Sequence, residues 1–290
     1  MEDRDWLILK LLFEQQNITK TAQALYISQP TLTTRLQQIE KEYGVKIVQR
    51  GRRGVQFTPE GEYLAKCADE VLVKLRQIHE HVSNMNNKVA GTLRLGVSNY
   101  FTTNKLPGLL KRFRSEFPDV EFKVMTGWSK DVYSMIYNHD VHIGFVRGSY
   151  EWGGSKQLLF DEPVCVASSR PVALDELPSL PRIDYQTDPL FKALIDSWWA
   201  ENYVEPPHIG MVVDRGETCK KMVMNGLGFA ILPRLVIEDA QELYTLDLTD
   251  TSGNPISRST WMFYHEESLH LNMVKAFVRF VEKLDVYSLM

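Results

Sequence analysis

Apolar residues recur at helical spacing in the first part of the chain and at strand spacing in the second part. Ile18, Ala22 and Leu25 fall at positions i, i+4 and i+7, which is one face of a helix. A second stripe at the same kind of spacing follows, made of Leu32, Leu36, Ile39 and Tyr43. The pattern predicts two short helices joined by a tight turn at residues 26–27.

The residues at both ends of the second helix are typical helix caps. Ser28 can accept hydrogen bonds from the free amides of the first turn, and Pro30 lies where a missing N–H costs nothing. Gly44 can adopt the left-handed conformation that ends a helix. The helix is therefore expected to run to about Tyr43.

A β-hairpin is predicted directly after this helix. Residues 45–50 and 55–58 alternate as two short strands, and Arg52 and Arg53 occupy the turn between them. A basic hairpin beside such a helix is typical of a winged helix-turn-helix, whose wing contacts phosphates or the minor groove. We expect residues 1–58 to form this DNA-binding domain.

The distribution of charge supports nucleic-acid binding better than the total does. The chain carries a net charge of −4, but residues 17–58 hold seven Lys or Arg against two Glu. The outward helix face carries short or forked hydrogen-bonding groups that suit base edges. The candidate DNA-binding residues are Ser28, Gln29, Pro30, Thr31, Thr33, Thr34, Arg35, Gln38, Arg50, Arg52 and Arg53. The alternative is a helical domain for protein contact whose arginines are only solvated.

This segment resembles the DNA-binding domain of the LysR-type transcriptional regulators. The matching runs, together with Gly44-Val45 and Arg50, are 21–25, 28–33, 36–40 and 57–61. The family often places Ser-Arg after the Leu of the recognition helix, where this chain has Thr33, Thr34 and Arg35. Its arginine is shifted by one residue, or about 100° around the helix axis. Whether Thr34 or Arg35 faces the groove is left open.

Residues 59–90 are predicted to form a dimerisation linker helix. Apolar residues there alternate in steps of four and three, namely Leu64, Ala68, Val71, Leu75, Ile78, Val82 and Met85. This heptad spacing makes a seam for another helix, and the resemblance implies the same. A helix packed only on its own domain is the alternative.

Residues 91–290 alternate between strands and helices, which predicts an α/β domain with mostly parallel strands. Strands are expected at 93–97, 120–125, 141–146, 163–167, 208–213, 229–232 and 260–264, and helices at 102–116, 130–138, 189–203, 216–225 and 269–284. The run 226–233 also resembles LysR-type effector domains. The resemblance implies a periplasmic-binding-protein-like fold of two α/β lobes: lobe I about 91–162 and 266–290, lobe II about 163–265.

Candidate ligand contacts lie at strand ends and helix starts, where small molecules bind in open α/β sheets. Arg147 ends an apolar strand and Arg258 begins another, so their two guanidinium groups could bind carboxylates through bidentate hydrogen bonds. The alternative is that each arginine pairs with a protein acid such as Asp161, Asp184 or Asp188. The candidate effector-binding residues are Ser98, Asn99, Tyr100, Thr126, Arg147, Thr218 and Arg258.

The effector itself is suggested only by resemblance. Residues 184–189, 145–147 and 258–260 are most similar to the citrate-responsive branch of the family, the catabolite control protein E type. This similarity implies citrate or a related carboxylate as effector. No cofactor is expected.

Other kinds of site are not indicated. The three cysteines, Cys67, Cys165 and Cys219, form no metal-binding or disulfide pattern, and His139 and His142 are read as a surface turn. No catalytic motif, signal peptide or membrane span is recognisable, so a cytoplasmic location is expected.

We therefore expect a ligand-responsive DNA-binding regulator of metabolic genes, not an enzyme. Its expected partners are double-stranded promoter DNA, a small-molecule effector and a second copy bound through the linker helix. The resemblance implies a homotetramer, and RNA polymerase is a further candidate partner. The alternative is a cytosolic metabolite-binding enzyme or sensor whose N-terminal helices serve assembly.

Overall fold

The computed structural model describes residues 1–51, 54–84 and 88–289, and the chain divides into two compact units. The first unit spans Met1–Asn86 and the second spans Asn87–Met290. No helix in the described ranges is long and apolar enough to cross a membrane.

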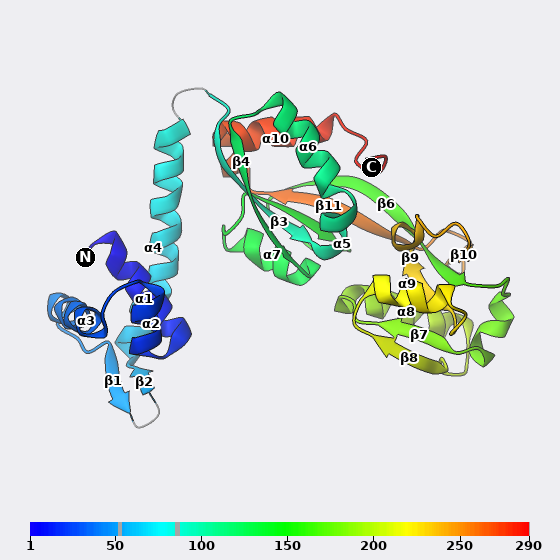
Figure 1. The fold of residues 1–290 in the computed structure, drawn as a ribbon, viewed down its shortest axis with the longest axis horizontal. Helices are drawn as coiled ribbons and strands as arrows, with labels where there is room; N and C mark the ends of the chain where they lie inside the picture. The colour runs from blue at the N-terminus through cyan, green and yellow to red at the C-terminus, as the bar shows by residue number, and fades with distance from the viewer. Residues whose placement is uncertain (52–53, 85–87, 290) are drawn as a thin grey trace. The chain divides into compact units, whose positions relative to one another are not determined.

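The first unit is a helical domain with a β-hairpin (Figure 1). Its elements are α1 (Asp3–Gln15), α2 (Ile18–Ala24), α3 (Gln29–Tyr43), β1 (Val48–Gly51), β2 (Gly54–Phe57) and α4 (Pro59–Ser83). The two strands pair antiparallel with Val48 opposite Phe57. Leu9, Leu12 and Leu32 are fully buried in a core shared by α1, α3 and the start of α4. The predicted winged helix-turn-helix is confirmed.

The helix ends follow the predicted capping chemistry. The Ser28 hydroxyl accepts a hydrogen bond from the Thr31 N–H at 3.2 Å, and Gly44 ends α3 with a φ of 68°. Asn17 caps α2 by accepting from the Lys20 N–H at 2.9 Å. Such caps are each worth about 1 kcal/mol, so they fix where α2 and α3 begin.

The buried stripe of α3 is shorter than predicted. Its first three members are buried, but Tyr43 is 42% exposed, so the prediction for Tyr43 was wrong. Ile47, in the segment that follows α3, is fully buried in the same core. Glu40 is buried instead, because its carboxylate accepts the Ile47 N–H at 3.0 Å and the Lys46 ammonium at 2.8 Å.

Helix α4 ends at Ser83, short of the predicted residue 90. Leu64 and Ala68, the first two apolar positions of its stripe, pack into the core of the first unit. Ile78 and Val82, further along, are 49% and 59% exposed. The first half of the helix therefore packs on its own domain, and its second half presents an apolar face to solvent. Pairing of this face with another helix stays a prediction. Met85 lies outside the described residues.

The second unit is built on a seven-stranded sheet (Figure 1). Its strands are β3 (Gly91–Ser98), β4 (Val120–Gly127), β5 (Ile143–Arg147), β6 (Ser155–Ser168), β9 (Ala230–Pro233), β10 (Tyr244–Asp247) and β11 (Ser257–Tyr264). They follow the order β10-β6-β11-β5-β3-β4, and β9 also pairs with β6. Only the pairs of β3 with β4 and β5 are parallel in this sheet. The expectation of mostly parallel strands was wrong, because the long strands β6 and β11 run antiparallel to their neighbours.

The first lobe places helices against the sheet around β3, β4 and β5. They are α5 (Asn99–Asn104), α6 (Leu106–Glu116), α7 (Ser129–Tyr137), the 3-10 helix η4 (Glu266–His270) and α10 (Asn272–Glu282). The single helix expected at 102–116 is two helices separated at Lys105, because Pro107 has no N–H to continue the first one. Phe113, Phe145 and Phe277 are fully buried between the helices and the sheet.

The second lobe combines the far ends of the long strands with a small parallel sheet. Its further elements are η2 (Leu174–Ser179), β7 (Arg182–Tyr185), α8 (Pro189–Asn202), β8 (Ile209–Val213), α9 (Gly216–Met224) and η3 (Arg234–Ile237). β7 pairs parallel with β8. The predicted two-lobed α/β fold is confirmed.

Strands β6 and β11 cross from one lobe to the other. Within β11, Ser257 lies opposite Pro163 of β6, whereas Thr260–Tyr264 pairs with β5 of the first lobe. Strand β11 is therefore shared by the two lobes. This crossing places Arg258 and Arg147 on neighbouring strands between the lobes.

Candidate functional site

The outward face of α3 is the candidate DNA-contacting surface. Thr31, Thr34 and Gln38 are exposed on it, as are Ser28, Gln29 and Pro30 at its start, while Thr33 is half-buried. The Gln29 amide donates to the Thr33 hydroxyl at 3.1 Å. This surface offers hydroxyls and amides of the length that reaches base edges.

Arg35 does not lie free on this surface. Its guanidinium donates from Nε to Asp5 Oδ1 at 2.5 Å and from Nη2 to Asp5 Oδ2 at 2.7 Å. Asp5 is 1% exposed, so the arginine fork is held against α1. That Arg35 contacts DNA stays a prediction: its Nε and one N–H of Nη2 are bonded to Asp5, so this edge of the guanidinium is not free for a base. Of the two residues left open, Thr34 is the one that is exposed.

The wing is described only in its strands. The Val55 N–H donates to the Gln16 carbonyl at 3.3 Å, which ties β2 to the end of α1. Arg50 pairs with Val55 through the backbone, but its side chain is not among the described atoms. Arg52 and Arg53 lie outside the described residues.

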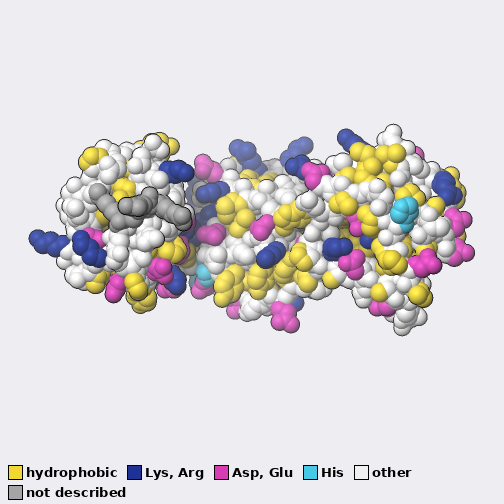
Figure 2. All heavy atoms as spheres, turned by 90° about the horizontal axis from the view of Figure 1, so that it is seen from below, with side chains coloured by type: hydrophobic (Ala, Val, Ile, Leu, Met, Phe, Trp, Pro, Cys, Tyr) yellow, Lys and Arg dark blue, Asp and Glu magenta, His cyan; other side chains and the backbone are white. Residues whose placement is uncertain are grey.

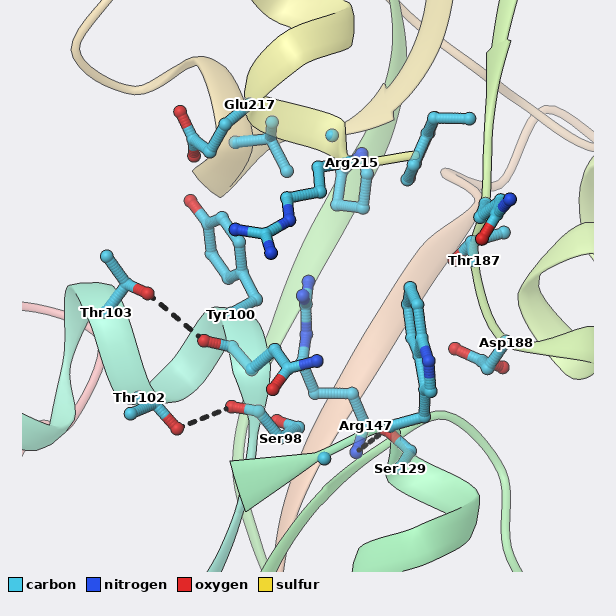
Figure 3. Close-up of a pocket in the computed structure, with 18 of the residues that line it drawn as sticks. Ser98, Tyr100, Thr102, Thr103, Ser129, Arg147, Thr187, Asp188, Arg215 and Glu217 are labelled. Atoms are coloured by element: carbon cyan, nitrogen blue, oxygen red, sulfur yellow. Dashed lines mark hydrogen bonds between the residues drawn. The ribbon is translucent and has the colours of Figure 1, made fainter. Parts of the chain in front are cut away.

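A cleft of about 570 Å³ lies between the two lobes of the second unit (Figure 3). Ser98, Asn99 and Tyr100 at the start of α5, Thr126 of β4, Arg147 of β5 and Arg258 of β11 all line it, so six of the seven expected effector residues come together. Thr218 does not line the cleft. The helical turn directs Thr218 elsewhere, while Gly216 and Glu217 of the same helix border the cavity.

Both arginines are buried and paired with protein acids. Arg147 is 4% exposed, donates from Nη2 to Glu162, and stacks its guanidinium 4.7 Å from the Tyr100 ring centre. Arg258 is 8% exposed and donates from Nη2 to Asp188. The two interpretations left open are therefore compatible: the arginines line the cleft and pair with acids.

The acids are held in turn by backbone amides. Asp188 accepts the Phe191 N–H at 3.0 Å and so caps α8, whereas Glu162 accepts the Leu235 N–H at 3.2 Å. Asp188 was among the acids expected from the sequence, but Glu162 was missed and Asp161 named in its place. Adjacent strand residues point to opposite faces, so Asp161 is exposed where Glu162 is fully buried.

Within the described part of the chain, three buried polar atoms of cleft-lining residues and one of a residue on the neighbouring strand have no hydrogen-bond partner. They are Ser98 Oγ, Arg147 Nε, Arg258 Nε and Thr260 Oγ1. Thr260 lies directly opposite Arg147 across the β5–β11 pair. A buried donor or acceptor without a partner costs about 1–3 kcal/mol, so this cluster favours a polar ligand that would satisfy it.

The second lobe contributes residues that the sequence did not single out. Arg215 and Glu217, at the start of α9, border the cleft, and Figure 3 shows Arg215 reaching toward the Tyr100 ring. Their position directly after β8, at a helix start, was the signal that could have found them. Tyr185 also lines the cavity. Burial raises the pKa of Tyr185 to about 12, so its hydroxyl stays protonated and can donate.

Burial also governs the charge of Arg147. Desolvation, together with the neighbouring Arg258 cation, lowers the pKa of Arg147 to about 9. The side chain remains a cation at neutral pH. An anion in the cleft would relieve the repulsion between the two arginines.

The buried thiols and the histidines form no second chemical centre among the residues that the structure describes. Burial raises the pKa of Cys165 and of Cys219 to about 12, so neither thiol is reactive at neutral pH. In the described ranges, no three His, Cys, Asp or Glu side chains are grouped to hold a metal ion. His139 stacks on His265 with ring centres 4.0 Å apart.

Comparison with known proteins finds likeness over the whole chain. The family model described as LysR substrate binding domain matches residues 86–285, and the one described as bacterial regulatory helix-turn-helix protein, lysR family, matches residues 4–62. The uncharacterised HTH-type transcriptional regulator YraN of Bacillus subtilis is 41% identical over 97% of this chain and 98% of its own. The HTH-type transcriptional regulator IlvY of Escherichia coli is 27% identical over 83% and 85%.

Solved structures share the fold at lower identity. Full-length CbnR in complex with its target DNA has a TM-score of 0.68 at 19% identity, covering 98% of this chain and 99% of that chain. Full-length OxyR from Pseudomonas aeruginosa has a TM-score of 0.67 at 18% identity, covering 99% and 96%.

Proposed function

Because the chain belongs to the LysR family of bacterial helix-turn-helix regulators, we propose that it controls transcription in response to a small carboxylate bound between its two lobes. It is a DNA-binding transcriptional regulator with an effector-binding domain. The relatives named above are transcriptional regulators, so an enzyme whose N-terminal helices serve only assembly is set aside.

The cluster of unpartnered polar atoms carries the ligand proposal. Ser98 Oγ, Arg147 Nε and Arg258 Nε are donors, and each remains without a partner although the same arginines bind acids through Nη2. A carboxylate accepts through two oxygens and can bridge such donors. The arginines would bind it, and the Ser98 hydroxyl would fix its orientation.

The balance of charges around the cleft limits how anionic the ligand can be. Two arginines share their charge with Glu162 and Asp188, and Arg215 stands beside Asp214 and Glu217. Citrate is the compound we would test first, on the resemblance of residues 184–189. A ligand with one or two carboxylates would meet less repulsion from these acids than the citrate trianion.

Calorimetric titration of the full-length protein with citrate, a dicarboxylate and a monocarboxylate tests the proposal. We expect one of these to bind, and Arg147→Ala and Arg258→Ala to abolish binding. The milder variants Arg147→Lys and Arg258→Lys keep a cation beside each buried acid but lose the fork, so they separate lost ligand contact from loss of folding. Absence of binding by all three carboxylates would reject the ligand class.

We further propose a homodimer formed through α4, and its action on promoter DNA in the cytoplasm. The exposed Ile78 and Val82 support the dimer, since a continuous apolar helix face is stable when a second helix covers it. A tetramer and a contact with RNA polymerase extend this proposal on the family resemblance alone.

A further inference from the structure

The recognition helix is fixed to α1 by a charged clamp. Asp5 accepts two hydrogen bonds from Arg35 and a third from the Glu2 N–H at 2.7 Å. The Glu2 carboxylate lies 3.4 Å from the same guanidinium. Burial alone would raise the pKa of Asp5, but the bonds from Arg35 and Glu2 hold it below its usual range. Arg35 therefore has a fixed position while the protein is folded.

The fixed guanidinium sets the orientation of a neighbouring amide. Arg35 Nη1 donates to Gln38 Oε1 at 2.9 Å. A guanidinium is a donor only, so the atom of Gln38 that faces it must be the amide oxygen. The NH₂ group of Gln38 is consequently directed away from Arg35, with two N–H donors available on an exposed side chain.

Gln38 lies on the outward stripe of the helix. Thr31, Thr34 and Gln38 are separated by three and four residues, which is the spacing of neighbours along one helix face, and all three are exposed. Arg35 flanks this stripe on the side of α1. Gln38 therefore stands beside the residues that face a bound major groove, and it presents donors there.

Glutamine normally reads adenine by using both ends of its amide, because adenine offers an acceptor at N7 and a donor at N6. The Gln38 oxygen keeps a second lone pair, but its bond to Arg35 turns this oxygen toward the guanidinium and leaves the NH₂ group as the end of the amide directed to the groove. Guanine presents two acceptors, N7 and O6, which match two N–H donors. We propose that Gln38 is a specificity-determining residue that selects a guanine in each half-site, and that Arg35 is its positioning residue. This inference rests on the DNA-binding role stated above.

Selection of duplexes from a random pool by the full-length protein tests the assignment. The wild type should enrich guanine at one position in each half-site, and Gln38→Ala should lose enrichment at that position alone. Discrimination there should fall about tenfold, within the range of one bidentate base contact. Gln23→Ala, on the exposed face of α2, is the matched control and should keep the wild-type preference.

The double variant Asp5→Leu with Arg35→Met tests the positioning role. It removes both ends of the clamp and leaves no unpaired buried charge. With its oxygen released, Gln38 can turn, and adenine should become as acceptable as guanine at that position. A clamp that only stabilised the fold would weaken binding to all duplexes alike and leave the ratio of guanine to adenine unchanged.

Two results would overturn the inference. One is an unchanged preference at every position in Gln38→Ala; the other is adenine, not guanine, at the position that this variant affects. If the wild type enriched no sequence at all, sequence-specific DNA binding itself would be contradicted. The role proposed for Gln38 would then fail as well.

Discussion

At the scale of single residues, the cleft is lined by arginines that pair with acids but still have hydrogen-bond donors without an acceptor. Arg147 and Arg258 each have one nitrogen bonded to an acid and one nitrogen without a partner. Backbone amides hold the two partner acids in place. If either arginine moved away, a buried carboxylate would be left without a partner, which is costly. A ligand can be bound here without breaking these pairs, by using the atoms that remain.

Ser98→Ala should weaken ligand binding about tenfold without destabilising the protein. The hydroxyl is buried and has no partner, so its removal deletes an unsatisfied group in the free protein and a hydrogen bond in the complex. Thermal unfolding and calorimetry measure the two effects separately. Ser134→Ala, on the exposed face of α7, should change neither; a loss of stability in Ser98→Ala with unchanged binding would contradict the assignment.

Tyr26 occupies a strained backbone position in the turn between α2 and α3. Its φ is 54° and its side chain is 96% exposed, so no packing compensates for the left-handed conformation. Tyr26→Asn should raise the free energy of unfolding by about 1 kcal/mol, since asparagine tolerates this region. Tyr63→Asn, an exposed tyrosine in the ordinary helical backbone of α4, should not be stabilising. Chemical denaturation measures both variants, and equal effects would argue against strain.

The Asp5–Arg35 clamp predicts a dependence of stability on acid pH. The pKa of Asp5 in the folded protein lies below its unfolded value of about 3.9, so the clamp stabilises the fold above that pH and is lost as the pH falls further. Asp5→Asn should therefore be less stable than wild type by about 1–2 kcal/mol at pH 7, and the gap should close as the pH falls through the lowered folded-state pKa of Asp5. Asp3→Asn, exposed in the same helical turn, should show no such gap; a gap for Asp5→Asn that persists into acid would contradict the clamp.

At the scale of elements, periodicity and capping predicted most helices and failed for short or exposed strands. Helices α3, α7, α8 and α9 begin and end within two residues of their expected positions. β7 and β10 have four residues each, and β10 is exposed throughout, so their patterns were too short to be predicted as strands. Strand direction also depends on which distant segments pair, and local pattern does not determine this. The same limit explains why Arg147 and Arg258 could be proposed from strand ends, whereas Glu162, their buried neighbour inside β6, could not.

Helix α4 should be the dimerisation element. Ile78→Glu places a charge on its exposed apolar stripe and should shift the full-length protein toward monomer by at least tenfold in dissociation constant, because a charge in a helix seam is costly to bury. Sedimentation or light scattering at several concentrations measures this shift. His79→Glu introduces the same charge on the neighbouring exposed residue and should leave the dimer intact. Equal dissociation in both variants, or none in Ile78→Glu, would place the interface elsewhere.

At the scale of the whole molecule, charge separates the two functions. Residues 17–58 have an excess of five positive charges, whereas residues 91–290 hold 20 basic against 26 acidic side chains. On the face drawn in Figure 2, the basic and acidic side chains of the second unit are interspersed. The phosphate backbone is therefore attracted to residues 17–58 and not to the second unit. Communication between the two must obey reciprocity: a ligand that changes DNA affinity has its own affinity changed by the same factor.

The most direct test of regulated DNA binding is the affinity of the full-length protein for its upstream promoter duplex, measured with and without saturating ligand over a range of salt. We predict a preference for the promoter over a scrambled duplex, a steep loss of affinity as salt rises through counterion release, and a ligand-dependent change in promoter affinity of at least fivefold. Equal affinity for promoter and scrambled duplex at every salt concentration, or a bound ligand that leaves promoter affinity unchanged, would contradict the account.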